Sequence, residues 1–162
     1  MQSAENLAQQ LQDYCLARKL KVTCAESCTG GLIAATITAI PGSSGYFERS
    51  FVTYCNAAKH ELLGVEESVL ATVGAVSEQT AKQMAQGALM AAKADMAVGV
   101  TGIAGPDGGS ALKPVGTVWI GWCVRGQEPF ARCFHFKGNR AEVRAQSVEQ
   151  ALMGLISCAK LA

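Results

Sequence analysis

The chain has no run of lysine or arginine, and its formal net charge is only +1. It therefore lacks the basic character that binding to nucleic acid leaves on a sequence. It also lacks an apolar stretch long enough to span a membrane, because the most apolar segment, residues 87–102, is interrupted by Lys93 and Asp95. We expect neither a nucleic-acid partner nor a membrane location.

Histidine is scarce as well. His60 and His135 are the only two, and neither lies in a G-x-S-x-G, C-x-x-C-H or H-E-x-x-H context. The sequence therefore disfavours a Ser/His/Asp hydrolase and an enzyme with a histidine-bound metal. For a hydrolase, the combination that remains is serine with lysine.

Cysteine is present, but without a recognisable framework. The seven residues are an odd number, and Cys24 and Cys28 have no second pair with which to form a closed zinc site. We interpret them as free thiols in a reducing compartment. The first ten residues, MQSAENLAQQ, lack the basic start and apolar stretch of a signal peptide, so we expect a cytoplasmic protein.

The length and pattern of the chain predict one domain over residues 1–162, without linkers or low-complexity segments. Apolar periodicity predicts helices over about 4–18, 31–40, 57–63, 77–94 and from 139 onward, with Asn56 capping the third and Asn139 and Glu142 starting the last. Strands are predicted over 20–26, 50–56, 96–102, 116–124 and 131–136. The fold class is α/β, with three layers (α/β/α) and a mixed sheet of about five strands.

Two glycine-rich turns follow predicted strands, "SCTGG" at 27–31 and "TGIAGPDGG" at 101–109. Such turns bring backbone N–H groups close to a ligand, and helix N-termini favour anions. Neither turn has the spacing of a P-loop or of G-x-G-x-x-G. From spacing alone, a structural turn and an anion site both remain open.

Tyr54 and Lys59 form a second candidate group. Lys59 lies in the first turn of a predicted helix, where the positive end of the helix and partial burial would weaken its hold on a proton. Such a lysine can serve as a general base for a serine, whereas a solvated surface lysine would have no such role.

Several of these stretches together resemble the CinA C-terminal domain family, namely "AESCTGG", "PGSSGYFERSFVTYCNAAKHELLGV", "GAVSEQTA", "TGIAGPDGG" and "KPVGTVWIG". The resemblance covers about residues 23–144, and no segment resembles the larger domain that precedes this unit in many members. It implies hydrolysis of the carboxamide of nicotinamide mononucleotide to nicotinate mononucleotide and ammonia, without metal or cofactor.

The resemblance also implies which residues act. The motif positions are Ser27, Ser44, Tyr54 and Lys59, with a mechanism similar to that of Ser/Lys amidases. We favour Ser27 as the nucleophile and expect Ser44 to relay a proton or contact the ligand; the thiol of Cys28 is an alternative nucleophile. For substrate binding we expect an oxyanion hole at Thr29, Gly30 and Gly31, and a phosphate site at Thr101, Gly102 and Gly105 with Arg140 or Arg144.

Two other functions stay open from the sequence. One is a module that binds a nucleotide without turning it over, and the other is a competence-related interaction protein. The oligomeric state is open too, and a homo-oligomer is compatible with the sequence. The apolar strands around Trp119 and Trp122 fit an interface or the core, and we expect the core.

Overall fold

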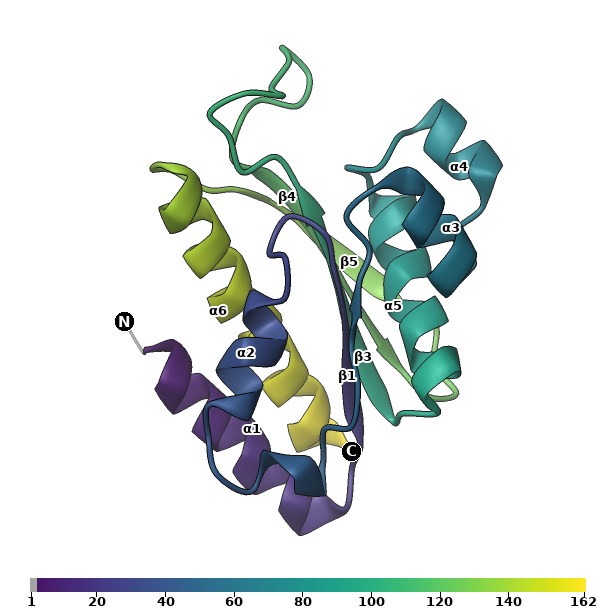
Figure 1. Ribbon diagram of the computed structural model, residues 1–162. Coiled ribbons are helices and arrows are strands. Elements are labelled where there is room, and N and C mark those ends of the chain that lie inside the picture. Colours follow the sequence, from purple (N-terminus) through teal and green to yellow (C-terminus); the bar gives the residue numbers. More distant parts are fainter. Residues whose placement is uncertain (1–2) are drawn as a thin grey trace.

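The computed structural model describes residues 3–162 and contains one five-stranded sheet (Figure 1). The strand order is β2-β1-β3-β4-β5; β1 runs parallel to β2 and β3, and β4 and β5 run antiparallel to their neighbours. The predicted mixed sheet is therefore confirmed. The strands are β1 (Val22–Glu26), β2 (Phe51–Val52), β3 (Met96–Gly102), β4 (Thr117–Val124) and β5 (Phe130–His135).

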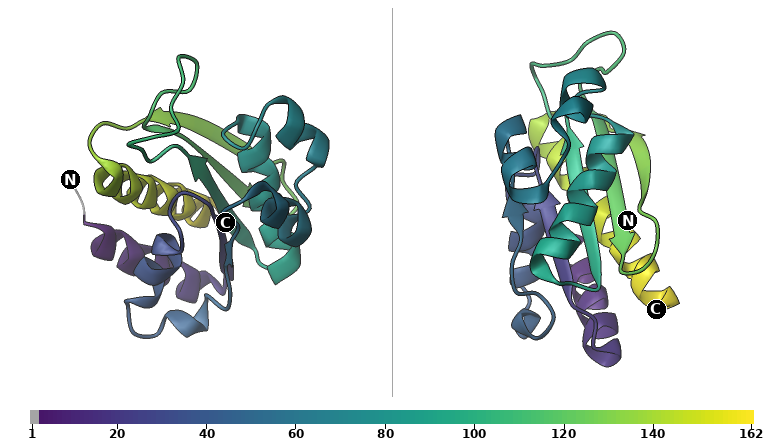
Figure 2. Two further views of the ribbon diagram at one scale, coloured as in Figure 1. Left: turned by 45° about the horizontal axis from the view of Figure 1, so that its top comes forward. Right: turned by 90° about the vertical axis from the view of Figure 1, so that its right-hand side faces the viewer.

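Helices cover both faces of this sheet, which gives the predicted three layers (Figures 1 and 2). One face carries α1 (Ala4–Arg18), α2 (Leu32–Thr38) and α6 (Arg140–Leu161). The other carries α3 (Asn56–Leu63), α4 (Glu67–Thr72) and α5 (Glu78–Ala92). A single 3-10 turn, η1 (Ser43–Gly45), follows α2.

Small residues let α5 lie directly against the sheet. A Cβ added to Gly121 would stand 2.6 Å from the carbonyl oxygen of Ala81, and one added to Gly99 would stand 2.8 Å from the amide nitrogen of Ala85. A side chain at either strand position would therefore push the helix away.

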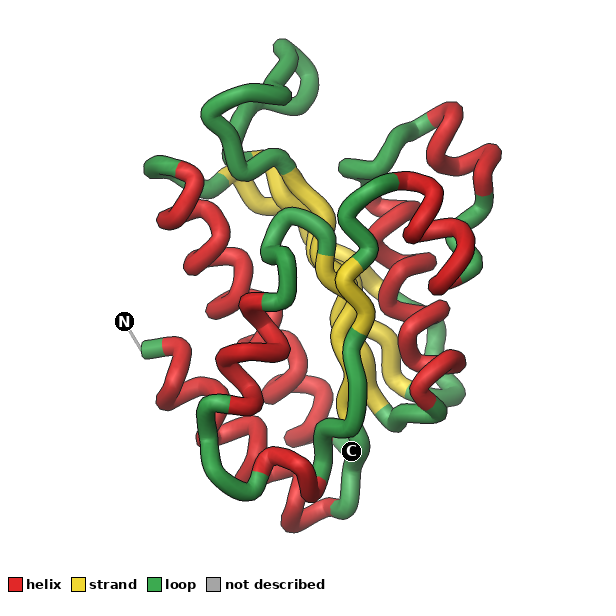
Figure 3. The backbone as a smooth tube through the Cα atoms, in the orientation of Figure 1, coloured by secondary structure: helices red, strands yellow, loops and turns green. Residues whose placement is uncertain are grey.

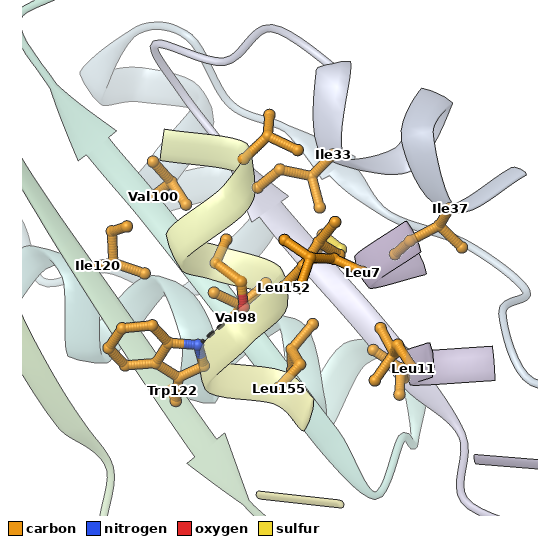
Figure 4. Close-up of a cluster of buried hydrophobic side chains, with 14 of the residues drawn as sticks. Leu7, Leu11, Ile33, Ile37, Val98, Val100, Ile120, Trp122, Leu152 and Leu155 are labelled. Atoms are coloured by element: carbon orange, nitrogen blue, oxygen red, sulfur yellow. Dashed lines mark hydrogen bonds between the residues drawn. The ribbon is translucent and has the colours of Figure 1, made fainter. Parts of the chain in front are cut away.

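The main core lies between the sheet and α1, α2 and α6 (Figure 4). Trp122 is buried there, as expected, and its indole N–H donates to the carbonyl of Ala151 at 3.1 Å. Trp119, on the opposite side of β4, is only half-buried. The other labelled residues of this cluster are Leu7, Leu11, Ile33, Ile37, Val98, Val100, Ile120, Leu152 and Leu155.

Helix ends agree with the sequence in one case and differ in another. Asn139 and Glu142 form the predicted capping box of α6, with side-chain bonds to backbone N–H groups of 2.9 and 3.0 Å. At α3, however, the cap is Cys55, and Asn56 is already the first helical residue. The strand predicted over 50–56 shrinks to two residues, because after Phe51 and Val52 only the N–H of Thr53 still donates to β1, at the carbonyl of Glu26, before the chain turns into α3. No pattern in the sequence predicted α4.

The segments that follow β1, β2 and β3 lie at the same end of the sheet (Figure 3). Parallel pairing places the carboxyl ends of these strands side by side, which is where open α/β sheets bind ligands. None of the helices described here combines the length and apolar character needed to cross a bilayer.

Candidate active site

The carboxyl ends of β1 and β2 bring Ser27 and Lys59 into contact. Ser27 directly follows β1, and its N–H is held by the carbonyl of Val100 in β3 at 3.0 Å. Lys59 lies in the first turn of α3, just after β2, and its Nζ lies 3.0 Å from Ser27 Oγ. Two residues that are 32 positions apart thus form a serine–lysine pair.

Lys59 is held in place by backbone carbonyls. Its Nζ donates to the carbonyl oxygen of Thr53 at 3.0 Å and to that of Tyr54 at 3.4 Å. The side chain is only 1% exposed, and none of the ion pairs within residues 3–162 involves it. Lys59 is therefore not the solvated surface lysine that the sequence left open.

Burial lowers the pKa of Lys59 below its ordinary value of 10.5, because the charged ammonium loses contact with water. The thiols of Cys55 and Cys28 act in the opposite direction and offset part of this effect. A lysine with a lowered pKa is more often a neutral amine near physiological pH and can accept the proton of a serine hydroxyl. The pair has the geometry and the electrostatics of a nucleophile with its general base.

A cavity of about 290 Å³ opens beside this pair. Asp107 and Arg140 contribute charged groups to its wall. A larger cavity of about 350 Å³ lies between α3 and α4, but it contains neither Ser27 nor Lys59. The remaining lining residues of the cavity beside the pair are Cys28, Tyr54, Asn56, Ala75, Val76, Thr101, Gly102, Ile103, Ala104, Gly105 and Gly108.

The segment between β3 and β4 forms one wall of the cavity and leaves backbone donors open. Within the described residues, the N–H groups of Ala104, Gly105, Asp107 and Gly108 donate to no protein acceptor. Thr101 is different, since its Oγ1 is buried and donates to the carbonyl of Ala75 at 2.8 Å. Thr101 therefore joins two walls of the cavity, and the open donors come later in the segment.

Arg140 stands at the start of α6 and faces the same wall. Its guanidinium donates to the carbonyl of Gly105 at 2.8 Å and to the hydroxyl of Tyr54 at 3.2 Å. Neither partner is charged, and no carboxylate in residues 3–162 pairs with Arg140. Its positive charge is thus available to an anion in the cavity.

Arg144 has another position. One turn further along α6, it donates to the carbonyls of Cys28 at 3.2 Å and of Thr29 at 3.1 Å. It does not line the cavity. Of the two arginines named from the sequence, Arg140 is the one that lies at the candidate ligand site.

The oxyanion hole expected at 29–31 is not open in this form. The N–H of Gly30 donates to the carbonyl of Ser27 at 3.0 Å, and the N–H of Gly31 donates to the carboxylate of Glu26 at 3.2 Å. Among the described groups of this turn, only the N–H donors of Cys28 and Thr29 donate to no other residue. The expectation for Gly30 and Gly31 therefore needs correction, because internal bonds already use their amides.

Ser44 lies at the opposite end of β1. Ser44 is exposed in η1. The carbonyl of Gly45, the residue after it, accepts a hydrogen bond from the side chain of Lys21, which directly precedes β1. The five residues of β1 separate that end from Ser27 by roughly 15 Å at about 3.3 Å per residue. A proton relay from Ser44 to Ser27 is not supported by this geometry.

Tyr54 contacts the pair through its backbone instead of its phenol. Its carbonyl oxygen accepts from Lys59 and, at 3.4 Å, from the hydroxyl of Ser27. The phenol oxygen is bound by Arg140, and the side chain is 62% exposed. Lys59 therefore reaches Ser27 without the phenol as an intermediate.

Cys28 lines the cavity, but its thiol is poorly suited as a nucleophile. Burial raises its pKa to about 11, although its own backbone N–H and Arg144 partly oppose this shift. The reactive thiolate is therefore a small fraction near neutral pH. Within residues 3–162, no group of three or more His, Cys, Asp or Glu side chains could hold a metal ion.

Sequence reasoning missed Glu26 and the backbone acceptors of Lys59. A carboxylate just before a helix can indicate a helix N-terminus, but Glu26 is the last residue of a predicted strand and gives no such sign. Backbone acceptors have no signature in a sequence, because every residue carries a carbonyl.

Comparisons with known proteins find relatives that are similar over most of the chain. The chain is 52% identical over 155 residues to "Nicotinamide-nucleotide amidohydrolase PncC" of Escherichia coli (strain K12), an alignment that covers 96% of this chain and 92% of that relative. It is 63% identical over 126 residues to the protein of the same name from Enterobacter agglomerans, covering 78% of this chain and 77% of that one.

Solved structures are similar over nearly the whole fold. The crystal structure of "competence/damage inducible protein CihA" from Agrobacterium tumefaciens superimposes with a TM-score of 0.94 at 47% identity, covering 97% of this chain and 96% of that chain. The model of the CinA C-terminal domain matches residues 4–159. The serine–lysine pair at the end of the parallel strands thus lies within a known domain, and the chain belongs to the CinA C-terminal domain family.

Proposed function

We propose that this protein is a nicotinamide-nucleotide amidohydrolase that converts nicotinamide mononucleotide to nicotinate mononucleotide and ammonia. The observation that carries the proposal is the 3.0 Å contact between Lys59 Nζ and Ser27 Oγ at a cavity that also holds Arg140. The names of the relatives at 52% and 63% identity support the choice of substrate. Free thiols at all seven cysteines support a cytoplasmic location.

In the first half of the reaction, neutral Lys59 takes the hydroxyl proton of Ser27 while Ser27 Oγ attacks the carboxamide carbon. The oxygen of the tetrahedral intermediate carries the negative charge, and the free N–H groups of Cys28 and Thr29 are the donors nearest to Ser27 in the chain. Lys59 then returns the proton to the departing nitrogen, so that ammonia leaves and a nicotinoyl ester remains on Ser27.

Water completes the cycle by the same proton path. Lys59 takes a proton from the water as its oxygen attacks the ester carbon, and the proton passes to Ser27 Oγ as the ester bond breaks. The released acid is nicotinate mononucleotide. Arg140 and the open N–H groups at 104–108 hold the phosphate of the nucleotide throughout.

The decisive experiment measures ammonia release from nicotinamide mononucleotide by the purified wild type and by Ser27→Ala. We expect the substitution to lower kcat by about four orders of magnitude while the nucleotide still binds. Ser44→Ala is the matched control, an exposed serine at the other end of β1, and should stay within about threefold of the wild type.

Two outcomes would overturn the proposal. Binding of the nucleotide by the wild type without any ammonia release would identify a binding module. Full activity of Ser27→Ala, or an acyl group recovered on the peptide that holds Cys28, would show that another residue is the nucleophile.

A further inference from the structure

Glu26, the last residue of β1, has a buried carboxylate whose partners are all backbone amides. Oε1 accepts from the N–H of Gly31 at 3.2 Å and of Ile33 at 2.9 Å, and Oε2 accepts from the N–H of Ala34 at 3.0 Å. The residue is fully buried, and no ion pair in residues 3–162 includes it. Three charge-assisted bonds thus satisfy one carboxylate.

This carboxylate does the work of a helix cap. The residue in the cap position of α2 is Gly31, which has no side chain that could accept a bond. A helix of seven residues is marginal by itself, so its start depends on such external partners. Glu26 supplies them from the strand and thereby ties the end of β1 to the beginning of α2.

The tie spans the turn that carries the candidate nucleophile. Only residues 27–31 lie between Glu26 and α2, and Ser27 is the first of them. Two further contacts fix the turn. The N–H of Gly30 donates to the carbonyl of Ser27, and Arg144 donates to the carbonyls of Cys28 and Thr29. Releasing the helix start would let the turn move, and a displacement of about 1 Å can cost about a hundredfold in rate.

We propose that Glu26 is a positioning residue for the reaction: its carboxylate holds the β1–α2 turn so that Ser27 Oγ stays within reach of Lys59. It also uses the N–H groups at the start of α2, so that those of Cys28 and Thr29 are the ones left for the substrate oxygen. The choice of substrate rests on the proposed function, whereas the placement of Ser27 does not.

The test compares Glu26→Ala with Glu26→Gln in the full chain. We expect Glu26→Ala to lower kcat by roughly a hundredfold and to leave KM within about threefold, because the phosphate site lies elsewhere. Glutamine keeps one oxygen acceptor but presents an NH₂ group to a backbone N–H. Glu26→Gln should therefore lose about tenfold in kcat, and it carries the test if Glu26→Ala does not fold.

A second helix cap is the matched control. Ser3 caps α1 by accepting from the N–H of Asn6 at 3.2 Å, and it is not among the residues that line the cavity. Ser3→Ala should lower the melting temperature and leave kcat unchanged. On the acidic side, the dependence of kcat on pH should follow the deprotonation of Lys59. Its midpoint should be the same in Glu26→Gln as in the wild type. A loss of stability with unchanged kcat in the Glu26 variants, or a rise of KM at constant kcat, would overturn the proposal.

A probe that does not depend on the substrate separates this proposal from the proposed function. With diisopropyl fluorophosphate, the bond from Ser27 Oγ to phosphorus forms, the P–F bond breaks, fluoride leaves, and the hydroxyl proton passes to Lys59. Labelling of Ser27 should slow in Glu26→Gln by about the same tenfold as kcat. Equal labelling rates in wild type and variant would refute the positioning role even if nicotinamide mononucleotide were not the substrate.

Discussion

The two glycine-rich turns of this protein look alike in sequence and differ in what their backbone can bind. In the β1–α2 turn, residues 27–31, Glu26, Arg144 and internal bonds use most of the polar backbone groups. In the segment that follows β3, the N–H groups of Ala104, Gly105, Asp107 and Gly108 remain open. We call residues 27–31 the closed turn, because most of its backbone groups are already bonded. We call residues 104–108 the open wall, because its N–H groups are available to a ligand.

This difference indicates that the two turns have different roles. A closed turn is rigid, which suits a nucleophile that must stay within about 3 Å of its base. An open segment offers donors, which suits a phosphate. We therefore expect changes at the closed turn to act on kcat and changes at the open wall to act on KM.

After Ser27→Ala, the largest effect should come from Lys59→Met, which removes the proposed base that α3 places against Ser27 of the closed turn. Without an acceptor for the hydroxyl proton, kcat should fall by about a thousandfold or more, with KM within a few-fold. Steady-state ammonia release at saturating substrate measures this. Retention of more than a tenth of the wild-type kcat would mean that Lys59 is not the base.

Arg140→Ala tests the open wall. The variant loses a cation that lies between Gly105 and Tyr54 without a charged partner. We expect KM for the nucleotide to rise by roughly ten- to a hundredfold with little change in kcat, and KM for the riboside, which lacks the phosphate, to stay the same. Equal loss with both substrates would place the phosphate elsewhere.

Arg144→Ala is the counterpart one helical turn away. Because Arg144 holds the carbonyls of Cys28 and Thr29, its loss should loosen the closed turn and lower kcat by about tenfold while KM is maintained. Kinetics of the two arginine variants, measured side by side, should show a change of KM in Arg140→Ala and a change of kcat in Arg144→Ala. A rise of KM in Arg144→Ala would erase the distinction between the two turns.

The smallest expected effect is on stability. Between the lowered pKa of Lys59 in the folded state and 10.5, the unfolded chain binds more protons, so wild-type stability rises with pH in that window. Lys59→Met lacks this group. The difference in melting temperature should therefore shift in favour of the wild type as the pH increases toward 10.5, and thermal unfolding at several pH values will detect it. A difference that does not vary with pH would contradict the burial of the charge.

Much of the fold could be predicted because local periodicity carries it. The helix at Ala4–Arg18, the strand at Met96–Gly102 and the capping box at Asn139 agree with the pattern of the chain. Prediction failed for α4, which has only six residues and none that is fully buried, and for β2, where only two residues pair with β1. Local patterns cannot report how long a strand keeps its partner.

The candidate site could likewise be predicted only in part from the sequence. Ser27 and Lys59 could be named because their motifs resemble those of a family, and Arg140 was one of two arginines named at the start of the last helix; the structure places all three at one cavity. Ser44 belongs to the same set of motifs but lies at the other end of β1. A motif ties residues together along the chain, whereas their distance depends on the direction of the strands.

The order of residues was enough to indicate the class of the fold, the residue types available for chemistry and the lack of a histidine in a catalytic motif. The folded chain was needed to show that Lys59 is buried against Ser27, that the amides of Gly30 and Gly31 are already bonded, and that a carboxylate in a strand caps a helix. Periodicity and charge can be inferred from the sequence because they are properties of neighbours in the chain. Burial, proton affinity and the availability of a backbone N–H are set by groups that the fold brings from far along the sequence.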